Sequence, residues 1–278
     1  MVTAAESRLS ECEVPMSEKA FRIVSLAPSN TEILCTLGLA DRLVGVDSDS
    51  DYPPEVQHLP KVGRGMEIDT TRVAELKPDL VVATLGAPGM ERIISRLEGQ
   101  GLRCLTLAPK SLGEVMDSFL LVGEATGREE AARRMMDRMN ETIERVAVAA
   151  AESESRPSVY WEWWPKPLVT AGRLSWITDM IEMAGGVNVF AELDQESPAI
   201  DEDLVFGKTP DVMVACWCGA ERPPDREKLK ARRGWGIVPA VQHDRVYTVE
   251  DFPFDRPGPR LAEGLELVAR ILHPELFR

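Results

Sequence analysis

The chain has 278 residues, enough for one large domain or two modest ones, and its 46 acidic and 32 basic residues give a net charge of −14. This acidic balance, with no basic run, argues against proteins that bind the nucleic-acid backbone or an anionic membrane surface. No stretch approaches the roughly 18 apolar residues of a membrane helix, and five cysteines do not suggest a secreted disulfide framework.

The N-terminal segment, residues 1–20, is polar and is expected to be a disordered tail. Charged side chains run through it, so it contains no apolar signal-peptide core. Cys12 follows Glu11 instead of an apolar stretch and is therefore a poor candidate for lipid attachment. Taken alone, this segment favours a cytoplasmic protein.

Four apolar runs in the first half are expected to be buried strands. They are FRIVSLA (21–27), RLVGV (42–46), the strand within ELKPDLVVAT (75–84) and LRCLTLA (102–108). Ser29 and Glu32 have the spacing of a capping box, which predicts a helix that continues to Gly38. A second helix is expected from the turn LGAPGM (85–90) to about Glu98.

The second half repeats this alternation. Its predicted pieces are strands at 158–164, 211–217 and 245–250 and a helix at 176–184. Strands and helices alternating at this spacing predict α/β lobes with parallel sheets, in which ligands bind beyond the carboxyl ends of the strands. That rule nominates six loops: 28–30, 47–51, 84–90, 163–168, 217–221 and 252–256.

The segment ELKPDLVVAT (75–84) has a second copy, FGKTPDVMVAC (206–216), in which Pro210 aligns with Pro78. In both copies a basic residue precedes a Pro-Asp pair and a run of buried-strand residues. The separation far exceeds the roughly 20–50 residues of a solenoid repeat. We therefore expect two similar lobes with a ligand cleft between them.

A long amphipathic helix is predicted from Arg128 to about Glu152, spanning roughly 37 Å at 1.5 Å per residue. One face carries an apolar stripe: Ala132, Met135, Met136, Met139, Ile143, Val146, Ala147 and Ala150. We interpret this stripe as core rather than as a cofactor surface. The expected organisation is a tail (1–20), an N-terminal lobe (21–127), a bridging helix (128–156) and a C-terminal lobe (157–278).

Six segments together resemble the substrate-binding proteins of ABC importers for cobalamin and iron-siderophores. They are residues 22–38, 44–56, 72–83, 97–107, 184–190 and 256–261, and the resemblance covers 21–273. The cobalamin-binding branch is the most similar, through SDYPP and FDRPGPR. The resemblance implies two Rossmann-like lobes joined by one long helix and a periplasmic or cell-surface location. We expect the chain to be a monomeric, non-enzymatic binding protein.

The resemblance also implies residue roles. The position of the branch's corrin-stacking aromatic is occupied here by Asp49, a departure from the pattern, whereas Phe254, Asp255 and Arg256 keep the residue types of its second ligand loop. Two glutamates that dock on permease arginines in the family correspond to Thr71 and Asp203; Thr71 cannot form an ion pair.

Four of the six tryptophans fall within 161–176. Strand alternation places Trp161 and Trp163 on one face and Trp164 on the other, and aromatic faces suit a large, flat, partly apolar ligand. The predicted ligand-binding residues are Pro28, Ser29, Asp49, Trp163, Trp164, Trp217, Phe254, Asp255 and Arg256.

Other chemistries receive less support. Cys216 and Cys218 lack the second ligand pair of a zinc site, and Asp47–Asp51 lack the later residues of a calcium loop, so no metal site is predicted. A P-loop is absent as well. The expected ligand is a corrinoid. The alternatives are a ferric siderophore, haem, a cytosolic corrinoid carrier or sensor without a permease, and an enzyme using the Cys216–Cys218 strand.

Overall fold

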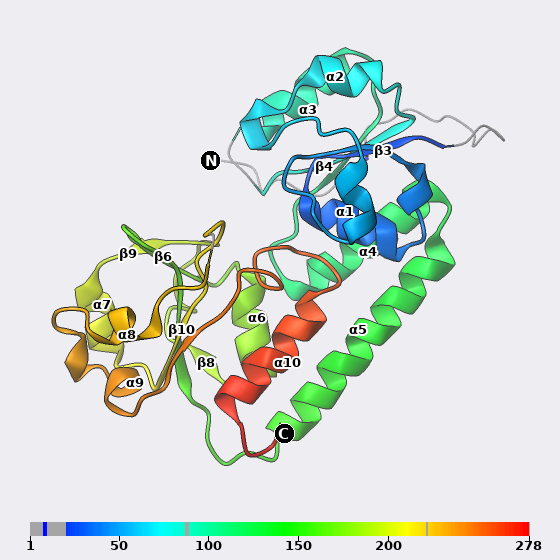
Figure 1. Ribbon diagram of the computed structural model, residues 1–278. Helices are drawn as coiled ribbons and strands as arrows, with labels where there is room; N and C mark the ends of the chain where they lie inside the picture. Colours follow the sequence, from blue (N-terminus) through cyan, green and yellow to red (C-terminus); the bar gives the residue numbers. More distant parts are fainter. Residues whose placement is uncertain (1–7, 10–20, 87–88, 221, 278) are drawn as a thin grey trace. The chain divides into compact units, whose positions relative to one another are not determined.

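The computed structural model describes residues 8–9, 21–86, 89–220 and 222–277 (Figure 1). The chain divides into two compact units. The first unit comprises residues 1–109 and 113–137, and the second comprises 110–112 and 138–278. Within the described ranges, no helix is long and apolar enough to cross a membrane.

The first unit is built on a sheet with strand order β1-β5-β4-β2-β3. These strands are β1 (Arg8–Leu9), β5 (Cys104–Leu107), β4 (Leu80–Thr84), β2 (Ile23–Ser25) and β3 (Leu43–Val46). The pairs among β2, β3, β4 and β5 are parallel, and β1 is antiparallel to β5. The disordered-tail prediction is therefore wrong for residues 8–9, while 1–7 and 10–20 lie outside the described residues.

Helices cover both faces of this sheet, which explains why its central strands are almost entirely buried and mostly apolar. Figure 1 shows α2 and α3 on one face and α1 and α4 on the other. They are α1 (Pro28–Thr36), α2 (Thr70–Glu75), α3 (Met90–Gly99) and α4 (Leu112–Thr126). Short 3-10 helices lie at Ala40–Arg42, Pro54–His58 and Gly65–Glu67.

The predicted capping box at the start of α1 is wrong. The N-cap is Ala27, in an extended conformation and without a side-chain hydrogen bond, because Pro28 occupies the first helical turn. Ser29 lies inside the helix and is buried.

The second unit has a mixed sheet with strand order β11-β10-β6-β7-β9, and β8 also pairs with β6. The strands are β6 (Ser158–Pro165), β7 (Leu168–Thr170), β8 (Val187–Asn188), β9 (Ala199–Ile200), β10 (Val212–Ala215) and β11 (Val246–Thr248). The predicted parallel arrangement is confirmed for β6, β8, β10 and β11. It is wrong for β7 and β9, since the two residues joining β6 to β7 are too few for a parallel crossover.

The helices of the second unit are mostly short. They are α6 (Trp176–Met183), α7 (Glu202–Lys208), α8 (Arg226–Lys230), the 3-10 helix Trp235–Ile237, α9 (Pro239–Gln242) and α10 (Leu261–Leu272). The long helix predicted between the lobes is α5 (Glu129–Ala150), which begins in the first unit and ends in the second. Its apolar stripe is buried at Ala132, Met135, Met139, Val146 and Ala150, which supports the core interpretation.

The sequence repeat corresponds to a repeated structural device. Asp79 accepts a hydrogen bond from the backbone N–H of Arg22 at 2.8 Å, just before β2. Asp211 accepts one from the backbone N–H of Ser158 at 2.9 Å, at the start of β6. In each unit the aspartate after the proline thus ties its own strand to the neighbouring strand.

Candidate ligand-binding site

The carboxyl ends of three parallel strands are aligned in the second unit. Ala215 of β10 pairs with Glu162 of β6 on one side and with Thr248 of β11 on the other. The segments that follow these residues therefore meet at the same edge of the sheet. We call residues 162–165, 216–219 and 249–255 the aromatic edge.

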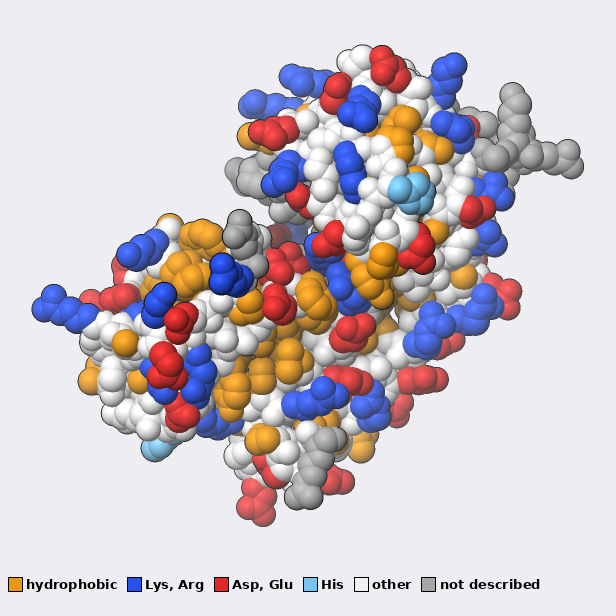
Figure 2. Space-filling view, in the orientation of Figure 1, with side chains coloured by type: hydrophobic (Ala, Val, Ile, Leu, Met, Phe, Trp, Pro, Cys, Tyr) orange, Lys and Arg blue, Asp and Glu red, His pale blue; other side chains and the backbone are white. Residues whose placement is uncertain are grey.

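Exposed aromatic rings gather at this edge. Trp164 is 42% exposed and its ring centroid lies 6.2 Å from that of Trp217, with the planes tilted by 56°. Phe252 is 41% exposed, and the guanidinium of Arg260 lies 4.6 Å from its ring centroid. Figure 2 shows hydrophobic side chains gathered on the surface where Figure 1 draws the tips of β6 and β9. The edge offers apolar area in the form of ring faces.

The two remaining aromatic residues predicted to bind ligand lie in the core. Trp163 and Phe254 are 7% and 0% exposed, and both pack on Trp161, at 5.6 and 4.9 Å between centroids. A Cβ added at Gly264 in α10 would lie 3.0 Å from the Phe254 ring, so this ring is held against the helix. Neither ring presents a face to the surface, and we include neither in the candidate ligand-binding site.

The loop that carries Phe252 is fixed by hydrogen bonds to its neighbours. Asp251 accepts from the backbone N–H groups of Gly219 and Phe252, each at 2.9 Å. The indole N–H of Trp176 donates to the carbonyl of Phe254 at 2.8 Å. Asp255 and Arg256, the polar ligand contacts predicted from the sequence, follow on this loop and are half-buried.

A buried ion pair lies directly behind the exposed rings. Glu162 is fully buried and accepts two hydrogen bonds from Arg232, at 2.6 and 2.7 Å. The indole N–H of Trp217 donates to the same carboxylate at 2.9 Å, and the hydroxyl of Tyr160 donates at 3.1 Å. Burial, followed by the nearby Glu162, raises the pKa of Tyr160, so its hydroxyl keeps its proton.

Sequence reasoning did not find Glu162 or Arg232. A signal existed, because a lone glutamate inside the apolar strand SVYWEWW requires a buried partner. The identity of that partner could not be read, since Arg232 is 70 residues away and lies in a segment without a strong pattern.

The thiols of the two cysteines near the edge have raised pKa values. Cys216 is buried, and burial raises the pKa of its thiol. Cys218 is exposed as a residue, yet desolvation of its sulfur, then Asp255 and Asp251, raises its pKa to about 12. Both thiols are therefore protonated at neutral pH, which argues against the thiolate that a nucleophile needs.

The corresponding edge of the first unit is polar. Asp47, directly after β3, is 2% exposed and accepts a hydrogen bond from Ser50, whose hydroxyl also lies 2.7 Å from that of Thr31. Lys61 donates to the carbonyl of Ser50 at 2.6 Å. Burial raises the pKa of Asp47, although the hydrogen bonds from Ser50 and from the Asp49 backbone act in the opposite direction.

The predicted ligand-binding residues of the first unit differ in accessibility. Pro28 is half-buried and Ser29 is buried at the start of α1, whereas Asp49 is exposed. The Asp49 carboxylate lies 3.4 Å from the guanidinium of Arg64. A negative side chain already paired with a cation is a poor substitute for an aromatic stacking surface.

Thr71 and Asp203, at the predicted permease-docking positions, are both exposed in the first turns of α2 and α7. The Thr71 backbone N–H is occupied by the N-cap Asp69, at 3.0 Å. Their accessibility is compatible with docking, which stays a prediction.

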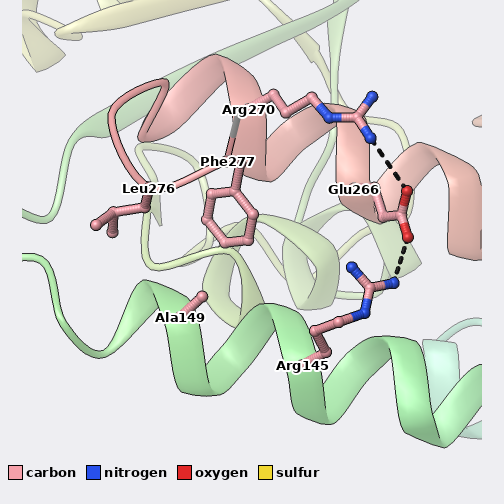
Figure 3. A pocket seen from close by; sticks show the side chains of 6 residues that line it. All are labelled: Arg145, Ala149, Glu266, Arg270, Leu276 and Phe277. Carbon is pink, nitrogen blue, oxygen red and sulfur yellow. Dashed lines mark hydrogen bonds and ion pairs between the residues drawn. The ribbon is translucent and has the colours of Figure 1, made fainter.

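A cavity of about 270 Å³ lies between α5 and α10 in the second unit (Figure 3). Arg145 and Arg270 both reach the carboxylate of Glu266, and the apolar wall consists of Ala149, Leu276 and Phe277. The volume is below the roughly 300–1,000 Å³ of typical ligand pockets, and its central charges satisfy one another. We do not assign the ligand to this cavity.

Among the residues that the structure describes, no three His, Cys, Asp or Glu side chains come together in a way that could hold a metal ion. The described site therefore consists of aromatic surface, a fixed loop and a buried ion pair. This arrangement can bind a flat ligand by contact area.

The chain is similar to several known proteins. An uncharacterized ABC transporter substrate-binding lipoprotein of Bacillus subtilis, YvrC, is 34% identical over 277 residues, which cover 97% of this chain and 85% of the relative. The solved vitamin B12-binding protein BtuF of Vibrio cholerae superposes with a TM-score of 0.76 at 27% identity, covering 91% of this chain and 96% of that one. The heme-binding protein RhuT of Roseiflexus has a TM-score of 0.80 at 26% identity, covering 91% and 98%.

The model of the periplasmic binding protein family matches residues 23–251, and the chain belongs to this family. Its α/β fold class, predicted from the sequence, is confirmed by the similarity to these solved structures.

Proposed function

We propose that the chain is the substrate-binding component of an ABC importer and that its ligand is a corrinoid, bound against the aromatic edge of the second unit. The carrying observation is the tilted pair formed by Trp164, which is 42% exposed, and the half-buried Trp217 at the carboxyl ends of β6 and β10. Rings of this size gain contact area and stacking with a flat macrocycle. The role is binding rather than catalysis.

Two cations of the second unit are already paired, which argues against an anionic iron chelate as the ligand. Lys110 lies 3.4 Å from Glu196, and Arg173 is paired with Asp194. A chelate carrying several negative charges would need cations that are not already neutralised within the protein. A corrinoid instead presents a largely uncharged ring with polar groups at its rim.

Haem is the second candidate, because it shares the flat tetrapyrrole shape. The specific support for it is the similarity to RhuT, a heme-binding protein, at a TM-score of 0.80. A competition experiment between a corrinoid and haem can decide which of the two macrocycles the protein binds.

The partner in this proposal is an ABC permease, and the location is the cell surface or periplasm. Support comes from the family and from the relative YvrC, a substrate-binding lipoprotein. A cytosolic corrinoid carrier remains the alternative and would bind ligand without stimulating a transporter.

A fluorescence titration tests the ligand. All six tryptophans lie in the second unit, so a macrocycle on the aromatic edge should quench their emission. We expect saturable one-to-one quenching by cyanocobalamin, and by haemin if the second candidate is correct. A response to neither, with the protein shown to be folded by circular dichroism, would sink the proposal.

A further inference from the structure

Trp217 differs from Trp164 in how its ring is held. Trp164 is exposed at the tip of β6, whereas the indole N–H of Trp217 is hydrogen-bonded to the Glu162 carboxylate at 2.9 Å. Glu162, a residue that was not predicted to be functional, therefore accepts a hydrogen bond from the indole N–H of Trp217 and is itself paired with Arg232.

Both oxygens of the Glu162 carboxylate accept hydrogen bonds. Its Oε1 accepts from Arg232 and Trp217, and its Oε2 accepts from Arg232 and Tyr160. A fully buried carboxylate is stable only when it is paired and hydrogen-bonded, and the two parallel bonds from the guanidinium satisfy this requirement. The arginine side chain is 18% exposed and lies 4.9 Å from the ring centroid of Trp235, which fixes it in turn.

We propose that the Glu162–Arg232 ion pair is a positioning device that preorients the Trp217 ring for the ligand. The inference rests on the proposed function and adds two residues to it. Because the carboxylate occupies the indole N–H, Trp217 offers the ligand only a ring face and not a hydrogen bond. The ring is ordered before the ligand arrives, so its ordering entropy is not lost on binding.

The positioning role predicts how much ligand affinity is lost when the Trp217 ring is released. A released side chain must be ordered when the ligand binds, and this costs roughly 0.5–1.5 kcal/mol of binding free energy. The cost corresponds to about a two- to tenfold loss of affinity. Removing the ring altogether, in Trp217→Ala, should weaken binding more than releasing it does, because the contact area is lost as well.

The test follows the indole N–H resonance of Trp217 and measures the affinity for the ligand. The indole N–H resonances of the ¹⁵N-labelled full chain report each tryptophan, and the peak lost in Trp217→Phe identifies Trp217. Glu162→Gln should move this peak in the ligand-free protein and weaken cyanocobalamin or haemin binding about two- to tenfold. If the variant does not fold, Arg232→Lys is used instead, because lysine keeps the charge but cannot form the two parallel bonds.

Glu192→Gln is the matched control. It makes the same change at an exposed carboxylate of the second unit, which is paired with Lys208. It should leave both the Trp217 peak and the affinity unchanged. A Trp217 peak that does not respond to Glu162→Gln overturns the positioning role, and so does a moved peak with unchanged affinity. A wild-type chain that binds neither probe instead refutes the proposed function, so the two failures are read from different measurements.

Discussion

The rings of Trp164 and Trp217 lie 6.2 Å apart with their planes tilted by 56°, although the two residues belong to different strand ends. The parallel register of β6 and β10 produces this proximity. Glu162 pairs with Ala215, and Trp164 and Trp217 each follow two residues later on their own strand. Tilted rings at this distance attract one another and still leave ring surface accessible. The relationship gives the proposed binding surface its accessible ring area.

The first prediction concerns Trp164. Because this ring is 42% exposed, Trp164→Ala should remove ligand contact with little effect on folding. We expect the affinity for the bound macrocycle to fall about tenfold or more, or roughly 1.4 kcal/mol, as measured by calorimetry. Ile237→Ala, at an exposed apolar position away from the edge, is the control and should change neither quantity. Unchanged affinity in Trp164→Ala would contradict the site.

The second prediction concerns Cys218. Its raised pKa of about 12 means that the thiolate is scarce at neutral pH. The modification rate attributable to Cys218, taken as the difference between wild type and Cys218→Ser, should rise about tenfold per pH unit above neutrality. Cys218→Ser should retain ligand affinity. Loss of a turnover activity in this variant would instead support the enzyme alternative.

The third prediction concerns the pH dependence of the first unit. Burial raises the pKa of Asp47, so the folded state binds a proton more tightly than the unfolded state. The contribution of Asp47 to the unfolding free energy should therefore be largest below about pH 4 and should decline as pH rises through the raised folded value. Asp47→Asn cannot ionise and should lack this decline.

Urea unfolding followed by circular dichroism, at several pH values between about 4 and 7, provides the measurement. The wild-type unfolding free energy should decrease relative to that of Asp47→Asn as pH rises. A difference that stays constant, or that changes in favour of the wild type, would show that the pKa of Asp47 is not raised.

The fourth prediction concerns Asn188 and its contribution to the stability of the second unit. Asn188 in AGGVNVF is 2% exposed, donates to Ala171 at 2.9 Å and Thr178 at 2.7 Å, and accepts from the Phe190 backbone at 3.0 Å. Asn188→Ala should lower the unfolding free energy of the second unit by about 2–4 kcal/mol, because buried partners lose their hydrogen bonds. Tryptophan fluorescence in urea reports this unit. Asn140→Ala, at an exposed site on α5, should change the value by less than about 0.5 kcal/mol.

Much of the fold could be predicted from local patterns. The buried runs at β2, β3, β4 and β5 are nearly all apolar, and α5 carries a continuous apolar stripe, so each element type was readable. The antiparallel β7 and β9 were missed because they are only three and two residues long. The start of α1 was misplaced because the constraint imposed by Pro28 outweighed the capping-box spacing.

The candidate site was only partly predictable. Alternation correctly separated Trp161 and Trp163 from Trp164, but it could not say which face is buried. That choice depends on the helices packed on the sheet, as the contact between Phe254 and Gly264 illustrates. The Glu162–Arg232 pair joins residues far apart in sequence, and such pairs have no local pattern.

The most direct test of the central claim is a crystal structure of the protein with cyanocobalamin bound. The account predicts the macrocycle in van der Waals contact with both Trp164 and Trp217, while the indole N–H of Trp217 remains hydrogen-bonded to Glu162. Ligand density elsewhere, for example in the cavity beside Arg145 and Arg270, or a macrocycle that contacts neither tryptophan, would contradict it.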